Sequence, residues 1–227
     1  MAHPLDNPIW SALTTRQAHL AIGNDRARRF PSDISPFAAA PDGSPTSSAA
    51  LAALLPAGGG FAQMQPAPTP PPAGVPITLS AIGVQMTATR ITPGSSDATI
   101  IDLGEADAPE MQALASLTRP GPFLPRTHTM GRFIGVRNMG RLIAMAGERL
   151  QPVGFTEISA VCTHPDHVGH GYGAALVRAV GARIFARGDT AFLHAYATNT
   201  GAIALYRKLG FDLRAEVTVS VWGELKL

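Results

Sequence analysis

The chain has 227 residues, enough for one large domain or two small ones with a substantial core. Apolar residues make up 45% of it and both charge signs are present, which is typical of a folded globular protein and argues against a disordered one. The formal net charge is only +2 and no dense basic run occurs, so nucleic acid is not expected as the main partner.

The cysteine content and the N-terminus bear on the compartment. A single cysteine, Cys162, excludes a disulfide framework and favours a reducing environment. Because Cys162 lies in an apolar segment, we expect a small buried hydrophobic side chain and not a nucleophile. The first residues lack a signal-peptide pattern and no apolar run reaches membrane-spanning length. We therefore expect a cytoplasmic protein without a membrane partner.

The first ninety residues carry weak structural signals. Asn7 followed by Pro8 predicts the start of a helix, residues 26–30 lead toward a strand, and residues 47–55 form a plausible helix. Six prolines between Pro66 and Pro76 indicate an extended loop or linker. A loosely alternating stretch over residues 75–89 is expected to hold a strand.

From residue 99 the periodicity is clearer. The expected elements are a strand over 100–103, a helix over 107–117, a hairpin of 133–136 and 142–148, a strand over 156–163, a helix over 174–186, a strand over 191–197, a helix over 201–209 and one or two strands over 213–225. Strands and helices in this order predict a mixed α/β fold.

One loop between the strand over 156–163 and the following helix has glycine at alternate positions, namely Gly169, Gly171 and Gly173. Free N–H groups at a helix N-terminus form an anion site, and glycine lets a bulky phosphate approach the backbone closely. Asn199 and Tyr206 follow on a short amphipathic helix. The pattern predicts a phosphate-bearing cofactor held at the loop, with the chemistry at the later polar residues.

A dinucleotide-binding fold is the competing interpretation of this loop, because the spacing of Gly169, Gly171 and Ala174 fits its looser pattern. That fold requires an acidic residue at the end of the next strand. Here the next strand ends in Ala195-Tyr-Ala-Thr198 without a carboxylate, and only about fifty residues remain after the loop. The dinucleotide interpretation is therefore excluded.

Two motifs carry a resemblance to a known family. Residues 168–173 match the loop pattern Gln/Arg-x-x-Gly-x-Gly/Ala at both glycine positions, with Val168 where Gln or Arg is usual. A second pattern, Asn-x-x-Ala-x-x-Leu-Tyr-x-x-x-Gly-Phe, is matched at Asn199, Ala202, Leu205, Tyr206, Gly210 and Phe211. With these motifs the sequence resembles the GCN5-related N-acetyltransferases (GNAT) over residues 97–223, and within them the FR47-like branch.

The resemblance implies a GNAT fold, in which a V-shaped central mixed sheet is flanked by helices, here with an additional N-terminal α/β segment. We place the acetyltransferase domain at residues 93–227. Residues 1–92 are expected to be a degenerate GNAT-like half or a cover for the acceptor side.

The resemblance also implies acetyl-CoA as co-substrate. Its pyrophosphate suits a helix N-terminus, and its pantetheine amides are able to pair with an exposed strand edge. The departure at Val168 weakens one contact without removing the cradle, because this position acts mainly through its backbone in the family. The expected cofactor-binding residues are Val161, Cys162, Thr163, Val168, Gly169, His170, Gly171, Tyr172, Gly173, Ala174, Asn199 and Tyr206.

Tyr206 is the predicted general acid, because a phenol with a pKa near ~10 is protonated at neutral pH and is able to donate to a departing CoA thiolate. The alternative for Tyr206 is simple packing beside Leu205 and Leu209. Asn199 has a second role open to it as the cap of the following helix. A backbone N–H near Val161 is expected to polarise the thioester carbonyl.

Glu157 is the candidate base that removes a proton from the acceptor amine, directly or through water. Its alternatives are a solvent-facing strand residue or a structural ion pair, with Arg132 or Arg141 as partner. Water acting alone is the other candidate base.

The histidines are weighed against structural roles first. His164, His167 and His170 straddle a proline and the glycine loop without supporting Cys or carboxylate ligands, so no metal site is expected. His194 is expected to be a packed or hydrogen-bonded residue, with a proton shuttle as the alternative. His128 is another candidate for the acceptor cleft.

The sequence thus predicts an enzyme that moves an acetyl group from acetyl-CoA to a primary amine by direct attack. The acceptor is a small-molecule or peptide amine whose identity stays open, and both monomer and homodimer are compatible. The main alternative is a non-catalytic acyl-CoA-binding or protein-interaction module. A second alternative keeps catalysis but uses a longer acyl donor or an amino-acid acceptor.

Overall fold

The computed structural model describes residues 3–67 and 69–225. Its helices are α1 (Pro8–Thr14), α2 (Pro45–Ala53), α3 (Ala108–Thr118), α4 (Tyr172–Ala186) and α5 (Thr200–Lys208). Its strands are β1 (Ile22–Gly23), β2 (Arg28–Arg29), β3 (Ala38–Ala39), β4 (Gly60–Gln65), β5 (Ile77–Ala88), β6 (Ile100–Leu103), β7 (Phe133–Asn138), β8 (Arg141–Glu148), β9 (Phe155–Thr163), β10 (Thr190–Tyr196) and β11 (Asp212–Gly223).

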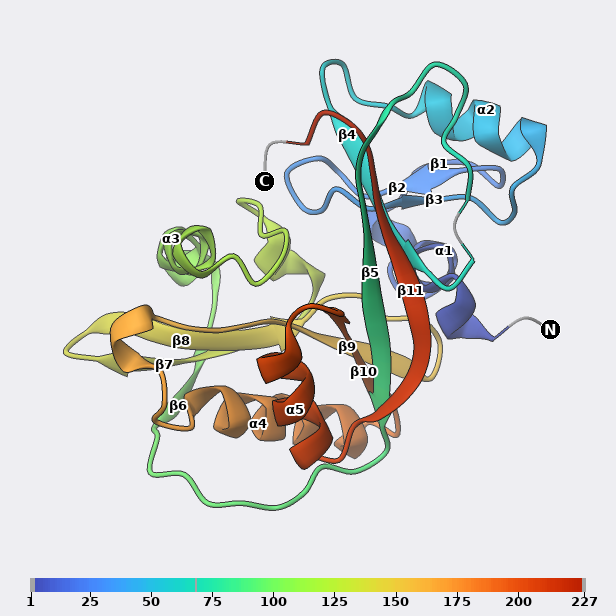
Figure 1. The fold of residues 1–227 in the computed structure, drawn as a ribbon. Helices are drawn as coiled ribbons and strands as arrows, with labels where there is room; N and C mark the ends of the chain where they lie inside the picture. The colour runs from blue at the N-terminus through green and yellow to red at the C-terminus, as the bar shows by residue number, and fades with distance from the viewer. Residues whose placement is uncertain (1–2, 68, 226–227) are drawn as a thin grey trace.

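A large mixed sheet forms the centre of the molecule (Figure 1). Over the described residues it has eight strands in the order β4-β11-β5-β10-β9-β8-β7-β6. Neighbouring strands run antiparallel except β9 and β10, which are parallel. A small antiparallel sheet, in the order β1-β2-β3, lies beside it. This arrangement confirms the predicted mixed α/β fold with helices flanking the sheet.

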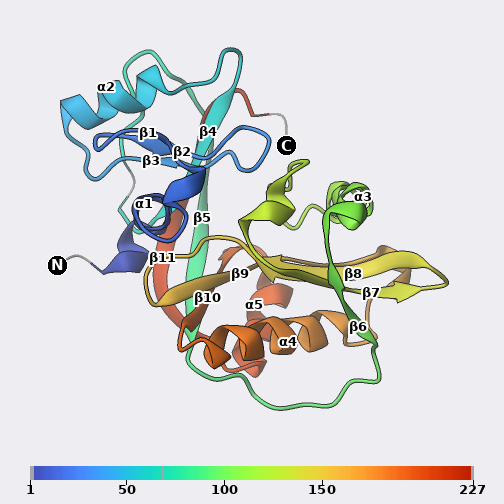
Figure 2. The ribbon, with the colours of Figure 1, turned by 180° about the vertical axis from the view of Figure 1, so that it is seen from behind.

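Helices α3 and α4 cover opposite faces of the sheet (Figures 1 and 2). Because side chains alternate along a strand, Ala144 and Ala146 of β8 pack in the cluster that contains the apolar stripe of α4. Met145, between them, packs in the cluster of α3. Strand β8 is buried along almost its whole length because the apolar faces of α3 and α4 cover its two sides.

Strand β9 contains a bulge that reverses its side-chain alternation. Ser159 pairs with Gly147 and Cys162 with Met145, so Ala160 and Val161 together face the single residue between those partners. Ala160 has a φ of 53°, in the left-handed region that residues with a Cβ rarely occupy. As a result Ile158 packs on the α4 side, whereas Cys162 packs on the α3 side.

Beyond the middle of β9 the two parallel strands separate. Strands β9 and β10 pair only from Phe155 opposite Thr190 to Glu157 opposite Phe192, although both continue beyond that point. The other edges of β9 and β10 stay paired with β8 and β5. The facing edges of the separated halves therefore form the V-shaped opening that the resemblance predicts.

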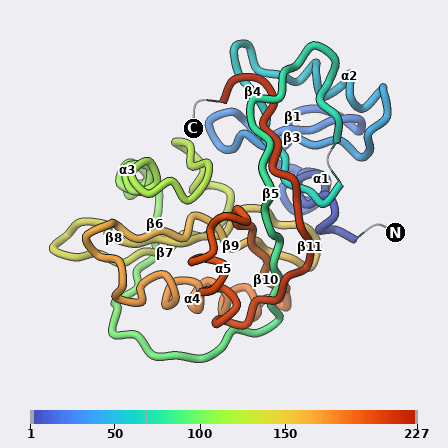
Figure 3. Tube along the Cα trace, in the orientation of Figure 1, coloured from blue at the N-terminus to red at the C-terminus, as the bar shows by residue number. Residues whose placement is uncertain are grey.

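The N-terminal segment contributes strands to the central sheet. Strand β5 lies between β10 and β11, and β4 pairs with the outer edge of β11. Figure 3 traces β5 and β11 side by side along the length of the molecule. Helix α1 packs on this part of the sheet through Ile9 and Leu13. The boundary near residue 92 stays a prediction, and residues on both sides of it pair within one sheet.

Most predicted elements are confirmed within a few residues of their expected bounds. The exceptions are β1, β3 and β4, for which no strand was expected. Helix α2 is found two residues earlier than expected and begins at Pro45 under a Ser44 cap. Residues 66–76 hold no helix or strand where they are described, and residue 68 lies outside the described part. Over the same described residues, no helix combines the length and apolar character needed to cross a membrane.

Candidate active site

A cavity of about 160 Å³ lies where β9 and β10 separate. Residues 158–161 of β9 form one wall, residues 194–196 of β10 form another, and α5 contributes Asn199, Ala202 and Tyr206. The wall opposite α5 comes from Phe37, β4 and β11, and residues 119–122 of the loop after α3 complete the enclosure. Segments from both halves of the chain therefore build a single cavity.

Tyr206 lies on the wall of this cavity and is 8% exposed. Its ring packs edge-on against Phe211, with the ring centroids 6.0 Å apart. Burial, together with the neighbouring Cys162, raises the pKa of the phenol to about 12. The group is thus fully protonated at neutral pH. Tyr206 therefore packs against Phe211 and lines the cavity at the same time.

Asn199 and the bulge of β9 lie on the same cavity. The Asn199 side chain accepts a hydrogen bond from the Ala202 amide at 3.1 Å, so it caps α5 as expected. On β9, Ala160 and Val161 line the cavity at the point where the ladder to β8 is interrupted. A bulge leaves one residue out of the regular ladder, and here that irregularity faces the space beside Tyr206.

The glycine loop leads directly into α4. Gly169 and Gly171 have φ values of 84° and 78°, and a Cβ added at either position would meet only open space. Gly171 is the N-cap of α4 and offers no side chain to bond its first amide groups. Val168 and His170 lie at the entrance to this loop. Val168 has 61% of its surface exposed. His170 Nδ1 is within hydrogen-bonding distance of the Val168 carbonyl oxygen, at 3.1 Å. These features leave a helix N-terminus accessible to an anion.

The remaining predicted cofactor residues continue from this loop. Tyr172 stacks on His170, and a Cβ at Gly173 would make ordinary contacts, 3.9 Å from Leu205 and Val161. Ala174 packs at the edge of the main core. Thr163 pairs with Ala144 at the end of β9. The structure thus places the loop, the first turn of α4 and the end of β9 next to one another.

Cys162 is buried, and this burial raises the pKa of its thiol to about 11. A thiol in this state is a small apolar side chain, which confirms the expectation for this residue. His164 and His167 have ring centroids 5.9 Å apart at the start of the glycine loop. In the described parts of the chain no three His, Cys, Asp or Glu side chains are grouped so as to hold a metal ion.

Glu157 forms a buried ion pair behind the cavity wall. Both carboxylate oxygens accept hydrogen bonds from Arg149, at 2.8 Å from Nε and 2.7 Å from Nη2. Burial alone would raise the pKa of Glu157, but the charge and hydrogen bonds of Arg149, with a hydrogen bond from His194, outweigh it and lower the pKa to about 2. The ion-pair alternative is therefore correct in kind, but its partner is Arg149, and neither Arg132 nor Arg141.

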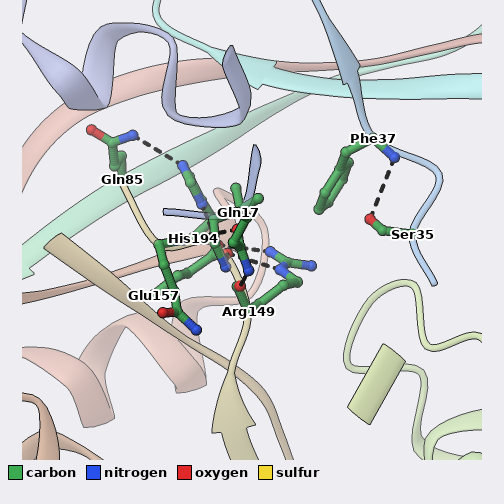
Figure 4. A network of polar contacts seen from close by, with 9 residues as sticks. Gln17, Ser35, Phe37, Gln85, Arg149, Glu157 and His194 are labelled. Carbon is green, nitrogen blue, oxygen red and sulfur yellow. Dashed lines mark hydrogen bonds and ion pairs between the residues drawn. The ribbon is translucent and has the colours of Figure 1, made fainter. Parts of the chain in front are cut away.

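Hydrogen bonds fix the protonation of His194 (Figure 4). Arg214 donates to Gln85 Oε1 at 2.7 Å, so the amide nitrogen of Gln85 faces His194 Nε2 at 3.1 Å. An amide nitrogen only donates, so His194 Nε2 accepts. Its Nδ1 then carries the proton and donates to Glu157 at 2.7 Å. His194 is thus neutral, in one tautomer, and its ring lines the cavity.

Sequence reasoning missed several residues of the cavity. Arg149 was not predicted to be a site residue. Its guanidinium carbon lies 4.8 Å from the ring centroid of Phe37 on the opposite wall. Arg119 lines the cavity from the loop after α3. No local pattern marks these residues, because they meet only through long-range strand pairing. His128, a predicted cleft candidate, pairs with Glu105 at 2.8 Å and is not part of the cavity lining.

The comparisons with known proteins agree with this geometry. The model of the FR47-like protein family matches residues 133–222. An acetyltransferase of the GNAT family from Novosphingobium aromaticivorans is 42% identical, with a TM-score of 0.91 over 99% of this chain and 100% of its own. A comparison with curated proteins finds no match. The chain belongs to the GNAT acetyltransferase family.

Two more distant structures share the fold. A GCN5-related N-acetyltransferase from Kribbella flavida is 18% identical, with a TM-score of 0.65 over 99% of this chain and 98% of its own. A GNAT-family acetyltransferase from Colwellia psychrerythraea is 13% identical, with a TM-score of 0.53 over 65% of this chain and 58% of its own. The first of these matches extends the likeness to the N-terminal segment, because it covers almost the whole chain.

Proposed function

We propose that this protein is an acetyl-CoA-dependent N-acetyltransferase that acetylates a primary amine. The observation that carries the proposal is the position of Tyr206. This protonated phenol lines a cavity at the opening between β9 and β10, beside a bulge in β9. The remaining residues of the cavity divide the work of binding, polarisation and proton transfer.

The cofactor end of the site fits acetyl-CoA. The uncapped N-terminus of α4, preceded by Gly169 and Gly171 in left-handed conformations, suits the pyrophosphate. The free edge of β9 beyond Glu157 suits the amides of the pantetheine arm. When bound, acetyl-CoA supplies an acetyl thioester that an amine attacks. The protein's own residues hold it, orient it and provide protons.

Tyr206 provides the proton that a departing thiolate needs. Its raised pKa of about 12 keeps it protonated at neutral pH, so its hydroxyl is available to donate to the thiolate as negative charge develops on the sulfur. The β9 bulge supplies the complementary group. Backbone groups at Ala160 and Val161 lie outside the regular ladder, so an N–H there is able to donate to the thioester carbonyl oxygen.

Water is the base that this geometry favours. The Glu157 carboxylate is completely buried, bonded to Arg149 and His194, and its pKa of about 2 makes it a poor proton acceptor at neutral pH. His194 Nε2 already accepts a hydrogen bond from the Gln85 amide nitrogen. A proton added to Nε2 would therefore point at another N–H donor. We therefore assign deprotonation of the amine to water in the cavity, and a structural role to Glu157.

Thiol release from acetyl-CoA with a panel of primary amines tests the proposal. We expect turnover in the wild type, and a fall in kcat of about 100-fold in Tyr206→Phe. The dissociation constant for CoA, measured by calorimetry, should change less than twofold, because the phenyl ring and its packing remain. Normal turnover in Tyr206→Phe would exclude Tyr206 as the acid.

CoA binding without turnover of any amine would instead support the non-catalytic module. A parallel assay with butyryl-CoA reports on the acyl chain, since a longer donor must also fit the cavity beside Tyr206. Faster turnover with butyryl-CoA than with acetyl-CoA would move the assignment to a longer acyl donor.

A further inference from the structure

The charge of the cavity is unusual for a site that receives an amine. Its lining, drawn from the described residues, includes Arg119 and Arg149 and contains no aspartate or glutamate. An unsubstituted alkylamine arrives at neutral pH as a cation, because its pKa resembles that of lysine. Arginines without a facing carboxylate repel such a cation. A negative group on the acceptor would offset this repulsion.

The two arginines differ in how their charge is compensated. Glu157 bonds both Nε and Nη2 of Arg149, so this guanidinium is neutralised behind the wall. Arg149 is also 7% exposed and directs Nη1 toward the loop, 3.9 Å from where a Cβ of Gly121 would lie. Arg119, by contrast, forms no ion pair with any described residue. Arg119 is an exposed residue, so it supplies a solvent-accessible positive charge that no described carboxylate pairs with at this side of the cavity lining.

Arg119 is held near the reactive end of the cavity. It is the C-cap of α3, with a φ of 50° and its amide bonded to the Ala115 carbonyl at 2.7 Å. The last turns of α3 pack through Leu114 and Ala115 in the cluster that contains Cys162 of β9. Cys162 directly follows the bulge at Ala160 and Val161. Arg119 lines the same cavity as Ala160, Val161 and Tyr206, so a carboxylate bound by Arg119 lies in the cavity that holds the predicted site of acetyl transfer.

The wall opposite α5 is apolar. It is formed by Phe37, Met64, Val219 and Val221, each more than nine-tenths buried. Burying an apolar side chain of the size of leucine or phenylalanine against such a wall contributes to binding in proportion to its area. The cavity thus pairs a cation near the chemistry with an apolar surface further in.

We propose that the acceptor is an apolar α-amino acid, and that Arg119 binds its carboxylate. The proposal rests on the N-acetyltransferase function above and narrows its acceptor. The carboxylate cancels the charge that would otherwise repel the amine. A guanidinium matches a carboxylate with paired hydrogen bonds, to which Arg149 Nη1 adds a further donor. The apolar side chain packs against the wall of Phe37, Met64 and Val221.

Matched acceptors test this inference. Leucine and 3-methylbutylamine differ only by the carboxylate, as do phenylalanine and phenethylamine. We expect the wild type to show a kcat/KM at least about 10-fold higher for each amino acid than for its decarboxylated partner. Higher or equal kcat/KM with the decarboxylated amines would overturn the inference and leave the acetyltransferase function intact.

Arg119→Gln then separates carboxylate binding from other effects. We expect it to lower kcat/KM for leucine about 10-fold to 100-fold, mainly through KM. Turnover of 3-methylbutylamine should stay equal to that of the wild type or rise, because the variant removes the positive charge that repels its ammonium group. The KM for acetyl-CoA should stay within twofold of wild type. The matched control is Arg141→Gln, because Arg141 is exposed at the start of β8 and away from the cavity lining. Equal losses with both acceptors, or a raised KM for acetyl-CoA, would refute the role of Arg119.

A different result is expected if the protein is not an N-acetyltransferase. If calorimetry shows CoA binding but no amine of either series releases thiol, the proposed function is overturned and this inference with it. Arg119→Lys provides the last check, because lysine keeps the charge but loses the paired donors. We expect its kcat/KM for leucine to lie between those of the wild type and Arg119→Gln.

Discussion

The buried pair of Glu157 and Arg149 allows a quantitative prediction. Glu157→Gln removes the negative charge but keeps an oxygen that accepts from His194. Arg149, whose side chain is 8% exposed, then remains as an uncompensated buried cation. Breaking a buried ion pair in this way costs about 3–5 kcal/mol. We expect the free energy of unfolding at pH 7 to fall by that amount.

The same residue predicts how stability depends on pH. The pKa of Glu157 is lowered from 4.5 to about 2 in the folded protein, so unfolding at low pH is coupled to proton uptake. The carboxylate contributes about 3 kcal/mol, since one pKa unit corresponds to about 1.4 kcal/mol. This stability is fully present above pH 4.5 and is lost as the pH falls through 2. Glu157→Gln should lack this part of the acid dependence.

Urea unfolding followed by circular dichroism, at pH 7 and in steps down to pH 3, measures both effects. Glu216→Gln is the matched control, because Glu216 is exposed on β11, and it should differ from wild type by less than about 0.5 kcal/mol. If Glu157→Gln is as stable as wild type at pH 7, or loses stability between pH 4.5 and pH 3 as steeply, the argument for a buried, charged pair is wrong.

A double variant isolates the charge from the packing. Replacing a whole buried pair by apolar or neutral groups is often close to neutral, whereas removing one partner is not. We therefore expect Arg149→Met combined with Glu157→Gln to be more stable than Glu157→Gln alone. A double variant whose loss equals the sum of the two single losses would show that the two side chains do not interact.

Three further variants test separate features. Gly171→Ala and Gly154→Ala strain backbones of similar φ, 78° and 75°, by roughly 1–2 kcal/mol each, but only Gly171→Ala should weaken CoA binding in calorimetry, about tenfold. Ala160→Val should lower the melting temperature, because a β-branched residue fits poorly at a φ of 53°.

The cofactor end of the site was predictable because its signals are local in the sequence. The glycine loop, the helix that follows and the Asn199 cap all lie within residues 157–211. Each depends on short-range geometry, such as the left-handed φ of Gly171 or the hydrogen bond from Ala202 to Asn199. The helical spacing of apolar residues likewise identified α4, because one face of this helix is buried.

The opposite end was not predictable for a physical reason. Strand β4 reads Gly-Phe-Ala-Gln-Met-Gln, in which the two glutamines predict a face turned to solvent, yet all six residues are buried. The Gln63 side chain is accommodated because it donates to the Ala38 carbonyl of β3 at 3.1 Å. Such a partner, 25 residues away, has no signature in the sequence. The pairing of Glu157 with Arg149 is hidden in the same way.

The position of β5 explains why the two ends of the cavity differ in origin. Because β5 fills the place between β10 and β11, the sheet continues past β10 into β11 and β4, and their apolar face becomes a cavity wall. A chain that ended its sheet at β10 would leave the edge of that strand exposed and lack this wall. The N-terminal segment thus completes the sheet and also supplies Phe37 and Met64 to the site. The surface proposed to contact an acceptor is thus built by the same strand pairing that stabilises the fold.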